Sequence, residues 1–108
     1  MCEYAWTSFN DNAKWFEYPP QDPKRFHPTA KPRALYDWIF RLYAKPGMKV
    51  FDPYLGQGNV RIAAYEAGCD FDGCELDETY FKLHEKMWDD YISQLSLFNT
   101  FTQEELNL

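Results

Sequence analysis

The architecture of this 108-residue chain follows from one run of ten residues, Lys49-Val50-Phe51-Asp52-Pro53-Tyr54-Leu55-Gly56-Gln57-Gly58. The stretch from Met48 to Asp52, which includes the first residues of this run, is short and apolar and therefore predicts a buried strand. Gly56 and Gly58 then form a loop, where the missing side chains let backbone N–H groups approach a ligand closely at a helix N-terminus. The run therefore predicts a strand, a glycine loop and a helix, with a candidate ligand site at the loop.

Helical signals lie on both sides of this run. Pro32 suits the first turn of a helix, and Lys45-Pro46-Gly47 stops it. Between them, apolar residues recur at helical spacing, namely Leu35, Trp38, Ile39 and Leu42. On the other side, small residues predict a second helix from about Gly58 to a C-terminal cap at Gly68.

A second strand is predicted at residues 71–76, because that stretch is again apolar and short. Two strands joined through a helix predict a parallel βαβ unit with a right-handed crossover. A third helix is expected from about residue 78 to residue 93, where aromatic residues recur at helical spacing. The predicted fold class is therefore α/β.

The two ends of the chain have a different character. Residues 3–9 and 13–18 are rich in strand formers around the turn Asn10-Asp11-Asn12, which predicts a β-hairpin. We divide the chain into a hairpin at 1–19, an α/β domain at 20–93 and a polar tail at 94–108. Residues 99–108 are expected to be disordered.

Composition narrows the classes of function. The net charge of −6 argues against this chain alone gripping a phosphate backbone. The three cysteines form no paired framework and no zinc spacing, so we expect no metal site. The absence of a signal peptide, a long apolar run or a lipidation motif leads us to expect a cytoplasmic protein.

Three features together resemble a known family. They are the run His27-Pro28-Thr29-Ala30-Lys31-Pro32, the run Asp52-Pro53-Tyr54-Leu55-Gly56-Gln57-Gly58, and Glu75 at the end of the second predicted strand. In this order they resemble the C-terminal half of bacterial and phage DNA amino-methyltransferases. Those enzymes transfer a methyl group from S-adenosylmethionine (SAM) to adenine N6 or cytosine N4 of DNA.

The resemblance implies a partial Rossmann-like SAM-methyltransferase fold with an incomplete sheet. It also implies roles for individual residues: Glu75 would bind the ribose of SAM, Asp52 would face its methionine end, and His27 and Thr29 would lie at its carboxylate. The implied cofactor-binding residues are His27, Thr29, Asp52, Pro53, Gly56, Gly58 and Glu75.

Several departures from the family pattern bear on activity. Ala30, Gln57 and Asn59 replace the residues usual in the family, which puts cofactor affinity in question. The catalytic tetrapeptide, Asp, Asn or Ser followed by Pro-Pro and an aromatic residue, is absent, and we interpret residues 17–21 as a linker. We therefore predict no catalytic residue in this chain, no activity alone, and completion by self-association or by a complementing methyltransferase half.

Two other interpretations stay open. One is a non-catalytic binding module with a degenerate SAM pocket. The other is a nicotinamide- or flavin-binding fold, which the glycine loop also suits, although Arg61 stands where that motif has its third glycine.

The tail contains one further motif, Gln94-Leu95-Ser96-Leu97-Phe98. It resembles the short extended peptide by which bacterial and phage proteins dock on the replicative sliding clamp. In that mode Leu97 and Phe98 would enter an apolar pocket of the clamp, while Gln94 would form a hydrogen bond at its rim. The predicted clamp-binding residues are Gln94, Leu95, Leu97 and Phe98. This predicts a sliding clamp as a partner.

Overall fold

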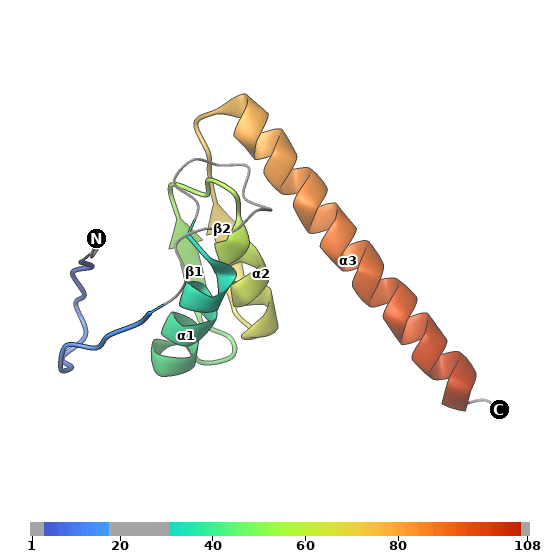
Figure 1. The fold of residues 1–108 in the computed structure, drawn as a ribbon, viewed down its shortest axis with the longest axis horizontal. Helices are drawn as coiled ribbons and strands as arrows, with labels where there is room; N and C mark the ends of the chain where they lie inside the picture. Colours follow the sequence, from blue (N-terminus) through green and yellow to red (C-terminus); the bar gives the residue numbers. More distant parts are fainter. Residues whose placement is uncertain (1–3, 18–30, 107–108) are drawn as a thin grey trace.

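The computed structural model describes residues 4–17 and 31–106 of the chain. In this part of the chain the elements follow in the order α1 (Arg33–Tyr43), β1 (Lys49–Asp52), α2 (Asn59–Glu66), β2 (Asp70–Gly73) and α3 (Glu78–Leu106). Figure 1 shows the first four elements gathered in one body, from which α3 runs outward. The arrangement is α/β with an incomplete sheet, as the sequence predicts.

The sheet consists of β1 and β2 in parallel, with Val50 opposite Phe71. Because α2 connects the two strands, the predicted βαβ unit is confirmed. β2 ends at Gly73, three residues earlier than the sequence suggested. Its partner β1 ends at Asp52, and the next residue, Pro53, has no N–H group with which to continue the ladder.

α1 begins and ends where the prolines predict. Pro32 is its N-cap with extended backbone, and the Pro32 carbonyl accepts a hydrogen bond from the N–H of Leu35 at 3.1 Å. At the other end, Gly47 adopts a φ of +88° directly after Pro46. The chain thus leaves the helix and turns into β1 within a few residues.

α2 carries most of the small core. The buried apolar side chains are Leu55, Val60, Ile62, Ala63 and Ala64. Gly68 has a φ of +76°, and a Cβ there would lie 3.4 Å from the Cβ of Pro46. The small buried side chains of Ala63 and Ala64 let α2 lie close to its neighbours.

One polar cluster ties the three helices together. The guanidinium of Arg33 (α1) forms an ion pair with the carboxylate of Glu66 (α2). The Tyr91 hydroxyl (α3) donates a hydrogen bond to Glu66 Oε1 at 2.6 Å. Partial burial and this hydrogen bond raise the pKa of Tyr91 to about 12. The hydrogen bond and Arg33 outweigh burial at Glu66 and hold its pKa below the ordinary value.

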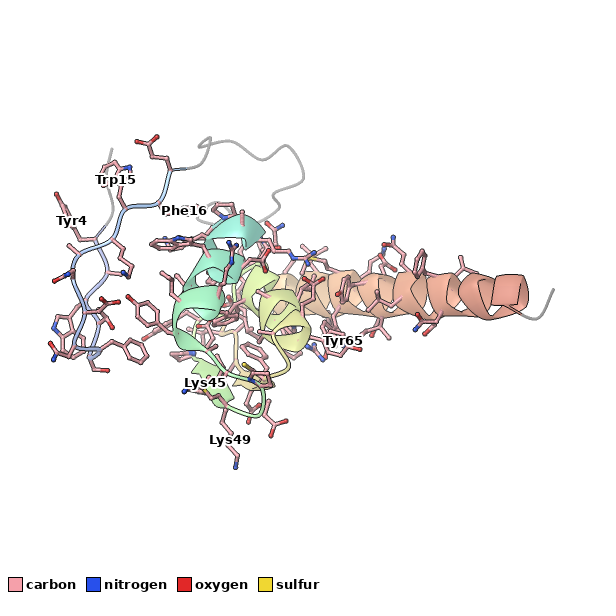
Figure 2. The ribbon with its side chains drawn as sticks, turned by 90° about the horizontal axis from the view of Figure 1, so that it is seen from below. Tyr4, Trp15, Phe16, Lys45, Lys49 and Tyr65 are labelled. Carbon is pink, nitrogen blue, oxygen red and sulfur yellow. The ribbon has the colours of Figure 1, made fainter. Side chains whose placement is uncertain are left out.

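The hairpin predicted at residues 1–19 is not found, because residues 4–17 contain no strand. This segment instead lies beside α1: the rings of Phe9 and Tyr43 stack at 4.5 Å, and Tyr43 donates a hydrogen bond to Asp11. Figure 2 shows Tyr4 and Trp15 away from the body of the protein. A two-stranded hairpin is marginal by itself, and the one sheet among the described residues consists of β1 and β2 alone, so it offers this segment no pairing strand.

The prediction for the tail is also wrong in its structure. α3 continues to Leu106, so the residues of the clamp motif lie within a helix and not in an extended peptide beyond its end. Leu97 and Phe98 are 58% and 67% exposed. Clamp docking stays a prediction that would require this part of α3 to unwind, and titrating a peptide of residues 94–98 with a purified clamp would test it.

Among the described helices, none has the length and apolar character to cross a membrane.

The link between α2 and α3 can be tested with Tyr91→Phe. Removing the hydroxyl should lower the free energy of unfolding by about 1 kcal/mol, measured by urea unfolding near neutral pH. Because the folded pKa of Tyr91 is raised from 10.0 to about 12, its contribution is complete below pH 10 and is lost as pH rises toward 12. The variant should therefore lose less stability than wild type in that pH window. Tyr4→Phe, at a 95% exposed position, is the control and should change neither quantity.

Candidate functional site

The glycine loop lies at the carboxyl ends of both strands. β1 ends at Asp52, directly before the loop, and Glu75 follows β2 by two residues. Because parallel strands end at the same edge of their sheet, the two carboxylates and the loop share that edge. In open α/β sheets this edge is where ligands bind.

Glu75 is fixed in place by two backbone groups. Its Oε1 accepts a hydrogen bond from the N–H of Gly56 at 2.8 Å, and its Oε2 accepts one from the N–H of Asp77 at 3.1 Å. The carboxylate is therefore oriented by the loop on one side and by the approach to α3 on the other. This joins the predicted ribose-binding acid to the predicted glycine loop.

The beginning of the loop is held from β1 and β2. The N–H of Tyr54 donates to Asp52 Oδ1 at 2.9 Å, and the N–H of Leu55 donates to the carbonyl of Cys74 at 3.0 Å. The Cys74 thiol donates to the Pro53 carbonyl at 3.5 Å. Backbone groups of the loop thus anchor it to the ends of both strands, and the buried Leu55 side chain packs against Gly73.

Five of the seven predicted cofactor-binding residues are brought together in this way: Asp52, Pro53, Gly56, Gly58 and Glu75. The other two, His27 and Thr29, lie outside the described residues. The first described residue after that segment, Lys31, accepts a hydrogen bond from Asn59 Nδ2 at 2.9 Å. Asn59 therefore links the start of α2 to the segment before α1.

Sequence analysis missed the contact behind the loop. His84 of α3 is only 2% exposed and lies against Gly58. The Nε2 atom of His84 is 3.2 Å from Nη1 of Arg61. The guanidinium of Arg61 in turn lies 4.0 Å from the centroid of the Trp88 ring. The i, i+4 spacing of His84 and Trp88 shows that they share a face of α3, but nothing in the sequence pairs that face with the loop.

The environment shifts both basic groups in the same direction. Burial and the neighbouring Arg61 lower the pKa of His84, and the Phe81 carbonyl and Glu85 only partly oppose this. Burial also lowers the pKa of Arg61, against the attraction of Asp89 and Glu85. Because the pKa of His84 is lower in the folded protein, its burial in neutral form makes the free energy of unfolding fall as the pH drops below the ordinary value of 6.5.

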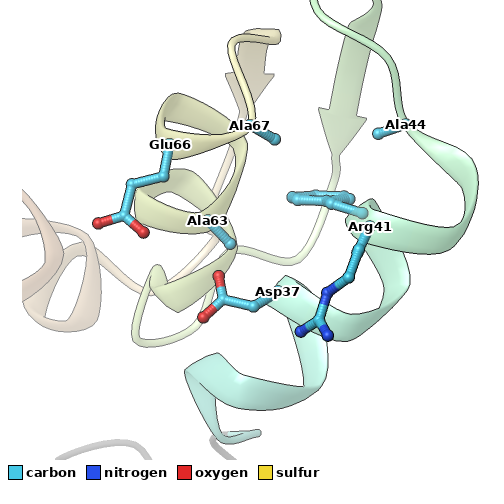
Figure 3. Close-up of a pocket in the computed structure, with 7 residues that line it drawn as sticks. Asp37, Arg41, Ala44, Ala63, Glu66 and Ala67 are labelled. Carbon is cyan, nitrogen blue, oxygen red and sulfur yellow. The ribbon is translucent and has the colours of Figure 1, made fainter.

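A groove also lies between α1 and α2. It has a volume of about 360 Å³ and is lined by Asp37, Phe40, Arg41, Ala44, Ala63, Glu66 and Ala67. Figure 3 shows Ala44 and Ala67 at the carboxyl ends of the two helices, where the groove continues. This is the opposite end of α2 from the glycine loop, so the groove and the candidate ligand site are separate. Among the described residues, no cluster of three or more His, Cys, Asp or Glu could hold a metal ion.

Comparisons with known proteins agree with this geometry. The family model described as DNA methylase, of the N6 and N4 methyltransferase type, matches residues 2–86. The chain is 37% identical over 57 residues to Type II methyltransferase M1.MboII of Moraxella bovis, covering 53% of this chain and 22% of that protein. It is 33% identical over 60 residues to Type II methyltransferase M2.DpnII of Streptococcus pneumoniae, covering 56% and 22%. The matched region thus spans about a fifth of these relatives.

A solved structure is similar over a larger share of the chain. The M1.HpyAVI–SAM complex matches with a TM-score of 0.57 and 30% identity, covering 69% of this chain and 44% of that one. A second crystal structure of M1.HpyAVI matches with a TM-score of 0.50 and 29% identity, covering 68% of this chain and 41% of that one. Because the family model covers residues 2–86 and the fold agrees, this chain belongs to the DNA methylase family of N6 and N4 amino-methyltransferases.

Proposed function

We propose that this chain is the SAM-binding portion of a DNA amino-methyltransferase that modifies adenine N6 or cytosine N4. The observation that carries the proposal is the position of Glu75, 2.8 Å from the Gly56 N–H at the sheet edge that also holds Asp52. Family membership and the likeness to a SAM complex support it.

The residues at this edge fit SAM chemically. Each Glu75 oxygen accepts one N–H, and a carboxylate has about four acceptor positions, so two ribose hydroxyls can still be bound. Asp52 uses Oδ1 for the Tyr54 N–H, which leaves Oδ2 for the ammonium group of SAM. By family resemblance, His27 and Thr29 bind its carboxylate. SAM supplies an activated methyl group, and these residues bind and orient the molecule that carries it.

Methyl transfer needs more than this edge. A polar group must hydrogen-bond the target amine and an aromatic ring must stack on the extruded base. The tetrapeptide that supplies both in the family is absent from the 108 residues. We therefore propose that the chain is inactive alone and that a polypeptide carrying this tetrapeptide completes the enzyme on DNA.

SAM binding is tested by calorimetric titration of wild type and Glu75→Gln. The amide oxygen of glutamine can still accept the Gly56 N–H, so the loop keeps its shape while the charge and one acceptor are lost. The dissociation constant should rise about 10- to 100-fold, since a charge-assisted hydrogen bond contributes about 1.5–3 kcal/mol. Glu78→Gln, at the exposed start of α3, should leave the constant unchanged.

The sheet itself has a face for the completing polypeptide. Lys49 and Phe51 share one face of β1, and Phe51 is 65% exposed opposite Asp72. Figure 2 shows Lys49 pointing away from α1. Parallel sheets are normally covered on both faces, and an unpaired edge strand invites association. This open face favours self-association, or docking of the missing half, as the means of covering it.

Light scattering tests the self-association. The wild-type chain should be a homodimer or larger at micromolar concentration, because burying Phe51 removes apolar surface from water. Phe51→Lys should shift it toward monomer, whereas Tyr4→Ser, at an aromatic and even more exposed position, should not. A wild-type chain that is monomeric across this concentration range would contradict the homo-oligomer and leave only the complementing half.

The second candidate is the non-catalytic binding module. The burial of Gln57, which is 7% exposed at the loop position where the family usually has a smaller serine, favours a degenerate pocket. The titration above separates the two functions: SAM binding that depends on Glu75 supports the enzyme portion. A chain that binds no SAM, even with a completing segment that carries the tetrapeptide, supports the module.

A further inference from the structure

His84 occupies the space that a side chain at position 58 would need. An ideal Cβ on Gly58 would lie 2.3 Å from Cδ2 and 3.1 Å from Cγ of the His84 ring. Gly58 also has a φ of +85°, a conformation that other residues rarely adopt. The imidazole therefore packs directly on the glycine loop, and the loop cannot keep its position if the ring moves toward it.

The hydrogen bond to Arg61 fixes the protonation state of this ring. A guanidinium has only hydrogen-bond donors. Because the Nε2 atom of His84 lies 3.2 Å from Nη1 of Arg61, Nε2 must accept this hydrogen bond. The single ring proton is then on Nδ1, and the ring is neutral. Nδ1 is buried, and no described residue forms a hydrogen bond of good geometry with it.

Protonation of His84 on Nε2 would break its hydrogen bond with Arg61. A proton on Nε2 would face the N–H groups of Arg61 and place two cations in contact, one of them on the His84 side chain, which is only 2% exposed. The charged groups around His84 are Arg61 on α2 and Glu85 on its own helix, while Asp89 acts on Arg61. Residues 56–58 have no ionisable side chain that could compensate.

The loop can transmit such a movement to the candidate ligand site. The N–H of Gly58 donates to the Leu55 carbonyl at 2.9 Å, and Gly56 binds Glu75. We propose that His84 is a positioning residue whose neutral ring holds the glycine loop in its ligand-binding shape, and that protonation of His84 releases the loop and weakens SAM binding. The effect on SAM rests on the function proposed above, whereas the effect on the loop does not.

The packing premise can be tested with two glycine substitutions. Gly47 has a φ of +88°, nearly that of Gly58, but a Cβ there would meet no atom within 4 Å. Gly58→Ala should therefore lower the urea midpoint of unfolding more than Gly47→Ala, and adding His84→Ala should recover part of the difference. Equal midpoints for the two single variants would contradict the contact.

The proton effect is tested by nuclear magnetic resonance of the full chain between pH 8 and pH 4.5. In wild type, the amide signals of Gly56 and Gly58 should move with the same midpoint as the His84 ring, below the ordinary histidine value. In His84→Gln, whose amide oxygen can replace Nε2 as acceptor but gains no proton, this movement should be absent. Glycine amides that ignore the His84 titration, or that move equally in the variant, would overturn the proposal.

The variant Arg61→Met tests the same effect with His84 retained, so that its result does not depend on how well a His84 variant folds. Removing the cation should raise the midpoint of the His84 ring and of both glycine amides together. Lys82→Met, a 72% exposed cation on α3, should raise neither. Midpoints for ring and glycines that separate in Arg61→Met would show that His84 does not control the loop.

Calorimetry with SAM over the same pH range separates this inference from the proposed function. Below the His84 midpoint the dissociation constant should rise about tenfold for each pH unit in wild type and stay flat in His84→Gln. The same pH dependence in both proteins would overturn the role of His84 while SAM binding stands. No SAM binding at any pH, with glycine amides that follow His84, would overturn the cofactor role and support the control of the loop.

Discussion

The packing of the His84 ring on Gly58 is the contact on which the relation between α3 and the rest of the fold depends. The βαβ unit and α1 are held by local turns and by the small side chains of α2. α3 departs from that body and contacts it through a few side chains, among which His84 is the most deeply buried. Glu66 and Tyr91 repeat the connection at the far end of α2. Together with the contacts of Arg61 and Tyr65 with the Trp88 ring, these two contacts hold the first half of the 29-residue α3 against α2.

The elements that the sequence predicted well have local causes. Proline and glycine determine the limits of α1 and the start and end of α2, and they act within a few residues whatever surrounds them. The hairpin failed because pairing depends on neighbouring strands, which local pattern cannot reveal. The sequence underestimates the length of α3, because the polar composition after residue 98 is also typical of a disordered tail. Residues 78–106 contain neither proline nor glycine, so nothing in the backbone chemistry stops the helix.

The candidate site divides in the same way. Asp52, the glycines and Glu75 were predictable, because parallel strands bring their carboxyl ends to one edge. His84 and Arg61 were not, because they lie on different helices, separated by 23 residues, and meet only through the packing of α3 on α2. The sequence indicates only that Asn59 is bulkier than the residue usual in the family, whereas in the structure its amide donates a hydrogen bond to the Lys31 carbonyl and joins the start of α2 to the segment before α1.

The geometry of a parallel sheet separates the two surfaces that this chain offers. Glu75 and the loop lie at the carboxyl ends of the strands, whereas Phe51 and Asp72 lie on a face, roughly at right angles to that edge. A polypeptide that covers the face therefore need not cover the loop. Such a polypeptide can add strands to the sheet and leave in place the backbone hydrogen bond between Gly56 and Glu75 at the candidate ligand site. Covering this face is therefore compatible with an open candidate ligand site, because the hydrogen bonds that order Glu75 come from the glycine loop and from the approach to α3.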